Sequence, residues 1–137
     1  MGGATPFIIA VLIVGVMILV AMMMTKKRNY RFNKEKYQTK FLSIENGLNK
    51  NNTATFMKTV IDGDKLLDKA MVEMGIPGKN MGERLKHSKD KFSDINAVWR
   101  AHKLRNALAH EDLEITYRQA HAALAIYKKA LKELGAI

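Results

Sequence analysis

The residues best suited to chemistry lie in one short stretch, residues 99–111, which reads WRAHKLRNALAHE. On a helix, four hydrogen-bonding side chains of this stretch fall within about 140° of arc: His102, Arg105, Asn106 and His110. An aromatic and several aliphatic residues share the stretch, so the polar groups would stand against an apolar wall. A few polar groups set in an apolar surface are more typical of a binding or catalytic site than of simple packing. This stretch is therefore the first candidate for a functional site.

On a helix, successive residues are about 100° apart, so residues 95–110 separate into two apolar stripes and one polar side. The first stripe consists of Ala97, Ala101, Leu104 and Leu108. The second consists of Ile95, Val98, Trp99, His102, Asn106 and Ala109, with Arg105 and His110 on its flanks. A helix covered on two sides needs two packing partners, and only one of them has to be the core of its own domain. The second stripe is thus the side on which we expect a site or an interface.

The composition limits the kind of protein and its partners. The chain has 137 residues, enough for one small domain and an accessory segment. It has no cysteine, which excludes a disulfide framework and a thiolate metal site. With 23 Lys+Arg against 13 Asp+Glu, the net charge of +10 favours polyanionic partners, either nucleic acid or anionic lipid headgroups.

The N-terminal part predicts a membrane anchor. Residues Phe7 to Met24 contain no charged side chain, and a helix of this length covers most of a hydrocarbon core about 30 Å thick. A cleaved signal peptide would carry positive charge before the apolar run, and here Lys26, Lys27 and Arg28 follow it instead. We therefore expect an uncleaved single span, the alternative being a buried core helix.

The basic residues that follow the span predict its orientation. They are Lys26, Lys27, Arg28, Arg31, Lys34, Lys36 and Lys40. By the positive-inside rule, the N-terminus lies outside and residues 25–137 lie in the cytoplasm of a single-pass membrane protein. The same cluster either binds anionic lipid as well or only fixes the topology.

The rest of the chain predicts an all-α fold, with a transmembrane helix followed by a bundle of four or five helices. Expected helices cover residues 29–48, 53–74 and about 80–87, then a helix capped by Ser93 or Asp94, and finally 116–134. Thr116 and Gln119 form the clearest capping box, and Gly135 ends the last helix. The predicted organisation is an anchor over residues 1–28 and a helical bundle over residues 29–137.

Asp64 is the less obvious candidate, because it falls in the middle of the apolar stripe of the helix over residues 53–74. An unpaired buried charge is costly, so a buried Asp64 needs a partner, and Arg105 is the natural one. The alternative is that the helix frays at Gly63, or that Asp64 faces solvent beside a lysine. His102 and Trp99 also have a plainer interpretation, as packed core or interface groups.

The sequence Arg105-Asn106-Ala107-Leu108-Ala109-His110 resembles the R-N-x-x-x-H form of the R-x(4–6)-H motif of HEPN domains. These domains are small all-helical bundles, many of them metal-independent endoribonucleases of toxin–antitoxin, phage-defence and RNA-processing systems. The resemblance covers about residues 53–134. It implies that Arg105 binds the scissile phosphate through its planar fork, that His110 is the general acid or base, and that Asn106 orients one of them. Asp64, His102 and Trp99 would support this site.

The resemblance also implies partners. It predicts RNA as substrate, no metal or cofactor, a homodimer formed through the motif helices, and an antitoxin or other partner protein. The products would carry a 2′,3′-cyclic phosphate. Two features depart from the family pattern: Asp112 stands where some nuclease branches have a tyrosine, and a membrane anchor is not a general family feature. The alternative hypotheses are a membrane-tethered helical dimer that binds RNA or a protein without cutting, and a lipid-associated structural subunit. The plain alternative for Arg105 and His110 is that they stabilise a helix C-terminus.

Overall fold

The computed structural model describes residues 2–25 and 30–137. Over these residues the structure is helical, with no strand, and it divides into two compact units, Met1–Tyr30 and Arg31–Ile137. The predicted all-α class is therefore confirmed for the described part of the chain. The basic flank Lys26, Lys27 and Arg28 lies outside the described residues.

Among its described residues, the first unit contains one helix, α1, at Ala4–Thr25. Its stretch Ala4–Met24 has a mean hydropathy of 3.1 and is 0% buried. The core helix of a soluble protein is mostly buried, unlike this stretch. The helix is long and apolar enough to cross a membrane.

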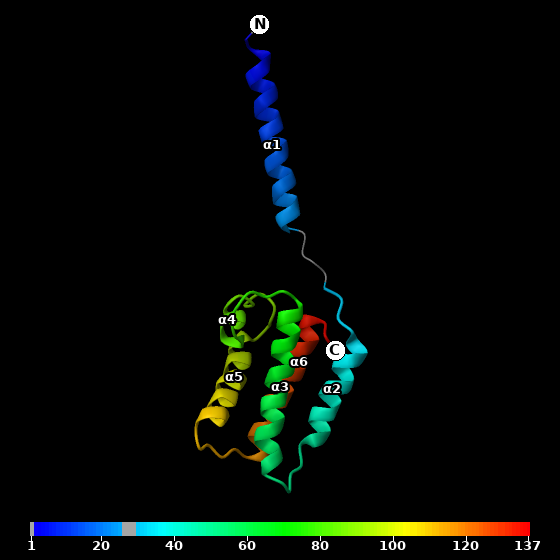
Figure 1. Ribbon diagram of the computed structural model, residues 1–137, viewed down its shortest axis with the longest axis vertical. Helices are drawn as coiled ribbons and strands as arrows, with labels where there is room; N and C mark the ends of the chain where they lie inside the picture. Colours follow the sequence, from blue (N-terminus) through cyan, green and yellow to red (C-terminus); the bar gives the residue numbers. More distant parts are fainter. Residues whose placement is uncertain (1, 26–29) are drawn as a thin grey trace. The chain divides into compact units, whose positions relative to one another are not determined.

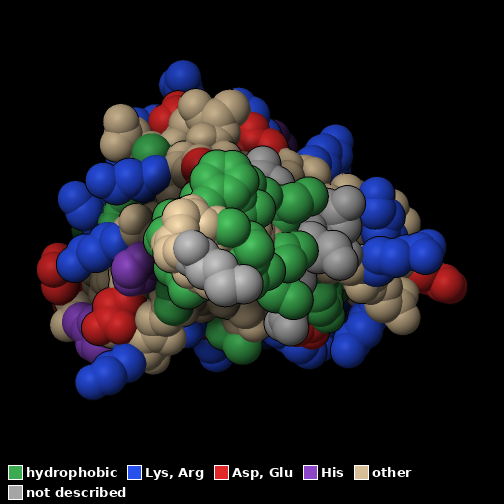
Figure 2. Space-filling model, turned by 90° about the horizontal axis from the view of Figure 1, so that it is seen from above, with side chains coloured by type: hydrophobic (Ala, Val, Ile, Leu, Met, Phe, Trp, Pro, Cys, Tyr) green, Lys and Arg blue, Asp and Glu red, His purple; other side chains and the backbone are tan. Residues whose placement is uncertain are grey.

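The second unit is a bundle of five helices, as Figure 1 shows. They are α2 at Lys34–Gly47, α3 at Ala54–Glu73, α4 at Met81–Lys86, α5 at Ile95–His110 and α6 at Tyr117–Leu134. Helix α3 is central, since it packs against α2, α5 and α6, while the short α4 packs on α5. Lys and Arg side chains protrude at several places around the space-filling view, in keeping with the net charge of +10 (Figure 2).

The core of the bundle comes from apolar faces at helical spacing. Its largest fully buried side chains are Tyr37, Phe41, Val60, Leu67, Met71, Leu85, Tyr127 and Leu131. Gly63 sets the distance between two of the helices, because a Cβ there would lie 2.7 Å from Cδ2 of Tyr127. The absent side chain lets α6 approach α3 closely, and this brings the ring of Tyr127 beside the residue after Gly63, which is Asp64.

The helix ends follow the predicted caps, except at the start of α2. Asp94, rather than Ser93, caps α5 by accepting a hydrogen bond from Ala97 N at 2.9 Å, and the Thr116–Gln119 capping box is present. Gly135 ends α6 in the left-handed conformation, with φ of 81°. The helix expected from residue 29 begins only at Lys34, because the side chain of Asn33 accepts from Lys36 N and caps it there.

Candidate functional site

Helix α5 is covered on both apolar stripes by its own unit. Val98, Ala101 and Leu108 are buried, and α5 packs against α3, α6 and α4. Trp99, on the second stripe, lies beside Gly82 of α4. Both packing partners that the two stripes require are therefore supplied by the same chain, apart from the exposed end of the helix at Ala109 and His110.

Asp64 is buried, with 3% of its surface exposed, and it is held by groups from two other helices. His102 Nδ1 lies 3.0 Å from its Oδ1, and the Tyr127 hydroxyl lies 3.2 Å from the same oxygen. The Arg105 Nε is 3.6 Å from Oδ2, an ion-pair distance that is too long for a hydrogen bond. Arg105 is thus a partner of Asp64, as expected, but the closest partner is His102. The solvent-facing alternative for Asp64 does not hold.

A chain of hydrogen bonds runs along one face of α5 from Arg105 to Asp64. Arg105 Nη1 donates to Asn106 Oδ1 at 2.9 Å, and Asn106 Nδ2 lies 3.3 Å from His102 Nε2. Because the amide nitrogen can only donate, Nε2 is the acceptor and Nδ1 carries the proton that is donated to Asp64. Every bond then points in one direction, and the four side chains fix each other's orientation.

Tyr127 closes this network from α6. Its hydroxyl also lies 3.0 Å from the Ala101 carbonyl oxygen, so it has two acceptors, one of them the Asp64 carboxylate. Burial, and next the negative charge of Asp64, raise the pKa of the Tyr127 hydroxyl well above its usual range. Tyr127 therefore keeps its proton and acts as a donor.

The network forms part of the wall of a cavity of about 690 Å³. Helices α3, α4 and α5 and the segment before α4 supply the charged lining residues, which are Asp64, Lys65, Asp68, Lys79, Arg84, Lys103 and Arg105. Both acids are already paired. Asp64 is held as described, and Asp68 accepts two bonds from Arg84, at 2.7 and 2.9 Å. No ion pair of Lys65, Lys79 or Lys103 is found in the described part of the chain, so the cavity is electrostatically suited to an anion.

The structure brings five of the six candidate residues together and leaves one apart. Trp99, His102, Arg105 and Asn106 line the cavity with Asp64, and the Trp99 and His102 rings meet edge to face with centroids 6.1 Å apart. His110 is the last residue of α5, is exposed and does not line the cavity. Five positions along a helix rotate a side chain by about 140°, which accounts for its separation from Arg105.

Sequence reasoning missed two parts of this site. Tyr127 is not among the residues predicted for the site, although a buried tyrosine hydroxyl usually has a hydrogen-bonding partner. Lys79 lies just before the six-residue helix α4, and Arg84 lies within it. This segment carries no motif, so nothing in the sequence indicated that the two residues line a cavity with α5. Among residues 2–25 and 30–137, no group of three His, Asp or Glu side chains could hold a metal ion.

Comparison with protein-family models, with curated proteins and with solved structures finds no match to this chain. The resemblance to HEPN domains therefore depends on the six residues from Arg105 to His110 and on their helical setting.

Proposed function

We propose that this chain is a membrane-anchored, HEPN-like domain that binds RNA at the α5 cavity and cleaves it as a homodimer without a metal ion. The observation that supports the proposal is the hydrogen-bonded chain Arg105–Asn106–His102–Asp64 on the wall of a positively lined cavity. A guanidinium fixed in this way is pre-organised to hold the oxygens of a phosphate.

Binding follows from charge. The Arg105 side chain is 26% exposed, so part of its guanidinium remains available to a ligand beside Lys65, Lys79 and Lys103. A protein that neutralises several phosphates releases the counterions condensed on the nucleic acid, so its affinity falls steeply as salt rises. This salt dependence is the expected signature of RNA binding at the cavity.

Cleavage follows the chemistry of an adjacent hydroxyl. The 2′-oxygen of the ribose forms a bond to phosphorus and gives its proton to a base, while the bond to the 5′-oxygen breaks and that oxygen takes a proton from an acid. The products are a 2′,3′-cyclic phosphate and a free 5′-hydroxyl. His110 supplies the acid or base, and Arg105 holds the phosphate.

A second copy of the chain completes this site. Arg105 lines the cavity of its own chain, whereas His110 is exposed at the end of α5. Dimerisation of the exposed end of one α5 against another chain would bring His110 of one copy to the phosphate that Arg105 of the other copy holds. Two such sites form in a two-fold symmetric dimer.

Residues Phe7 to Met24 of α1 form the membrane span in this proposal. The positive-inside rule then gives an N-terminus outside and a helical bundle in the cytoplasm, where RNA is available. The anchor would confine the ribonuclease to the inner surface of the membrane.

The test uses the full chain in detergent, incubated with total RNA in EDTA. Arg105→Ala and His110→Ala should each abolish cleavage, and the matched variants Arg118→Ala and His121→Ala, at exposed positions of α6, should not. An equal mixture of the Arg105→Ala and His110→Ala chains should recover about a quarter of the wild-type activity, because half of the dimers would have one intact site of two. Cleavage that persists in both single variants would refute the assignment.

The exposed position of His110, outside the cavity, favours a second candidate function: a tethered domain that binds RNA without cutting it. In that case RNA would be recovered intact, and Lys79→Gln or Lys103→Gln would weaken binding about as much as Arg105→Ala. Binding without cleavage under all conditions would support this second function over the first.

A further inference from the structure

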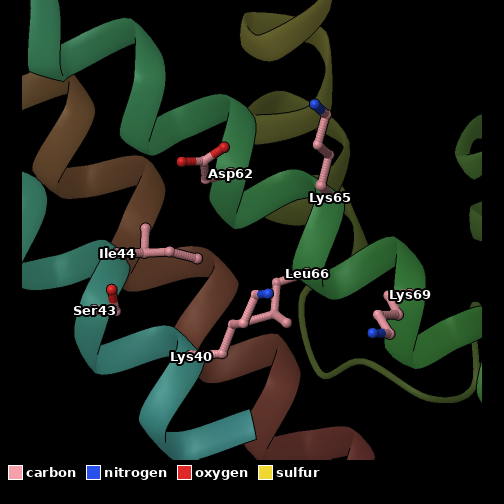
Figure 3. Close-up of a pocket in the computed structure, with 7 residues that line it drawn as sticks. All are labelled: Lys40, Ser43, Ile44, Asp62, Lys65, Leu66 and Lys69. Carbon is pink, nitrogen blue, oxygen red and sulfur yellow. The ribbon is translucent and has the colours of Figure 1, made fainter.

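A groove lies between α2 and α3, on a part of the bundle that the proposed RNA site does not use apart from Lys65. It encloses about 440 Å³ and is lined by Lys40, Ser43, Ile44, Asp62, Lys65, Leu66 and Lys69. In Figure 3, Lys40 extends from α2 toward Leu66 of α3, and Lys69 lies one turn after Leu66. Lys65 extends away from Leu66. The groove therefore combines two lysines, a hydroxyl and an apolar floor.

The positive charge of this groove is not neutralised by its own acid. Asp62 is the acidic residue in the lining, and it pairs with Lys58 one turn earlier on α3. Within the described residues, neither Lys40 nor Lys69 has an ion-pair partner. A second hollow of about 500 Å³ adjoins the first along α2, shares Lys40 and Ser43 with it and adds both Lys36 and Glu35. The hollow thus continues toward the start of α2 without further net positive charge, and the unpaired charge of the groove is that of Lys40 and Lys69.

We propose that the α2–α3 groove binds the phosphate of an anionic lipid headgroup, with Lys40 and Lys69 forming ion pairs with the phosphate. Leu66 is buried and Ile44 half-buried beneath the lysines, so the floor suits the glycerol and first methylenes of a lipid better than a fully hydrated anion.

The short segment between α1 and α2 favours lipid over RNA as the occupant of the groove. Eight residues separate Thr25, where α1 ends, from Lys34, where α2 begins. A chain of eight residues reaches about 28 Å at full extension, so in a membrane-anchored protein lipid headgroups are present near α2 at a high effective concentration. Each lysine close to an anionic surface strengthens binding about fivefold. The inference rests on the membrane anchor and is independent of ribonuclease activity.

The test uses the full chain in nanodiscs made of phosphatidylcholine alone or mixed with phosphatidylglycerol. Individual lysines are acetylated and followed by mass spectrometry. Lys40 and Lys69 should react about fivefold or more slowly in the anionic discs. Lys86 and Lys89, which are exposed near α4, should change by less than about twofold and serve as internal controls. Equal reactivity of Lys40 and Lys69 in both kinds of disc would overturn the proposal.

A second measurement identifies the occupant. Native mass spectrometry of the detergent-extracted chain should show retained phosphatidylglycerol in the wild type and in Lys86→Gln/Lys89→Gln, and should lose it in Lys40→Gln/Lys69→Gln. Protection of Lys40 and Lys69 in neutral discs by added inorganic phosphate would show a free anion site instead. The same protection by added RNA would show a nucleic-acid surface, and either result overturns the lipid assignment.

Discussion

Replacing Asp64 by alanine should destabilise the bundle strongly, because this carboxylate is the acceptor on which three helices converge. The substitution removes the acceptor that lies 3.0 Å from His102 Nδ1. Because His102 is only 8% exposed, water does not readily replace that acceptor. It also removes the ion-pair partner of Arg105 Nε, a buried nitrogen that makes no hydrogen bond of its own. Tyr127 is less affected, since the Ala101 carbonyl remains at 3.0 Å.

The magnitude can be built from these groups. An unsatisfied buried donor costs about 1–3 kcal/mol, and breaking a buried ion pair by removing one partner costs about 3–5 kcal/mol. The Arg105 side chain is 26% exposed and can turn toward water, which reduces the second contribution. We expect a loss of about 3 kcal/mol for Asp64→Ala. Asp64→Asn keeps the shape and one acceptor oxygen and should cost about half as much.

The chain offers a direct assay, since its single tryptophan, Trp99, contacts His102 inside the site. Urea unfolding of the full chain in detergent, followed by Trp99 fluorescence, reports on the bundle and not on the apolar α1. The matched control is Asp62→Ala, two residues away on α3, which removes a partly exposed pair with Lys58 and should change stability by less than about 1 kcal/mol. If Asp64→Ala and Asp62→Ala shift the midpoint equally, the buried network does not stabilise the fold.

Three further predictions concern the same bundle. Gly63→Ala should lower the free energy of unfolding by about 1–3 kcal/mol although alanine has the better helix propensity, because the new Cβ would lie 2.7 Å from Tyr127 Cδ2. The control is Gly47→Ala, whose Cβ would meet Thr59 Cγ2 at 3.8 Å, an ordinary contact. This control should be neutral or slightly stabilising in thermal unfolding. The pKa of Tyr127 is raised in the folded state, so above about pH 10 only the unfolded chain releases this proton, and stability falls by about 1.4 kcal/mol per pH unit. Urea unfolding followed by circular dichroism at pH 8 and pH 11 should therefore show the advantage of the wild type over Tyr127→Phe shrinking or reversing, and an unchanged difference would contradict the burial argument. Thr116→Ala should cost about 1 kcal/mol in thermal unfolding through the lost cap, and Thr116→Ser should restore it.

The elements of the fold could be predicted because their signals are local. Asn80, Asp94 and Thr116 each accept a hydrogen bond from a backbone N–H three residues later, and each stands where the sequence predicted a helix start. The predicted helix over residues 29–48 starts too early, because the apolar spacing of the sequence continues backward past Asn33. The cap decides where the helix begins, because the Asn33 side chain accepts a hydrogen bond from an N–H that has no partner within the helix, whereas loose apolar spacing satisfies no such group.

The site could be predicted only in part, because the sequence gives faces of helices and not their contacts. It predicted that Asp64, if buried, needs a partner, and named Arg105, whose Nε lies 3.6 Å from the carboxylate. It did not give His102 as the closer partner, because that choice depends on the rotation of α5 against α3. The contact between Tyr127 and Asp64 depends on Gly63, because its missing side chain lets α6 approach α3 closely. The sequence alone does not show that α6 packs against α3 at this glycine.

Helix α5 has an inner part that belongs to the hydrogen-bond network and an exposed end that does not, and this difference explains why one motif leads to two functional hypotheses. Its inner residues, His102 and Asn106, are committed to a network that fixes Arg105, and such a network is useful whether the bound phosphate is cut or only held. The exposed end with His110 contributes nothing to that network, so within one chain this histidine stabilises only the C-terminus of α5, by at most about 1 kcal/mol. Loss of RNA cleavage without loss of stability in His110→Ala would therefore separate catalysis from folding more cleanly than any substitution at Asp64, His102 or Arg105, whose effects on binding and on stability are coupled through shared hydrogen bonds.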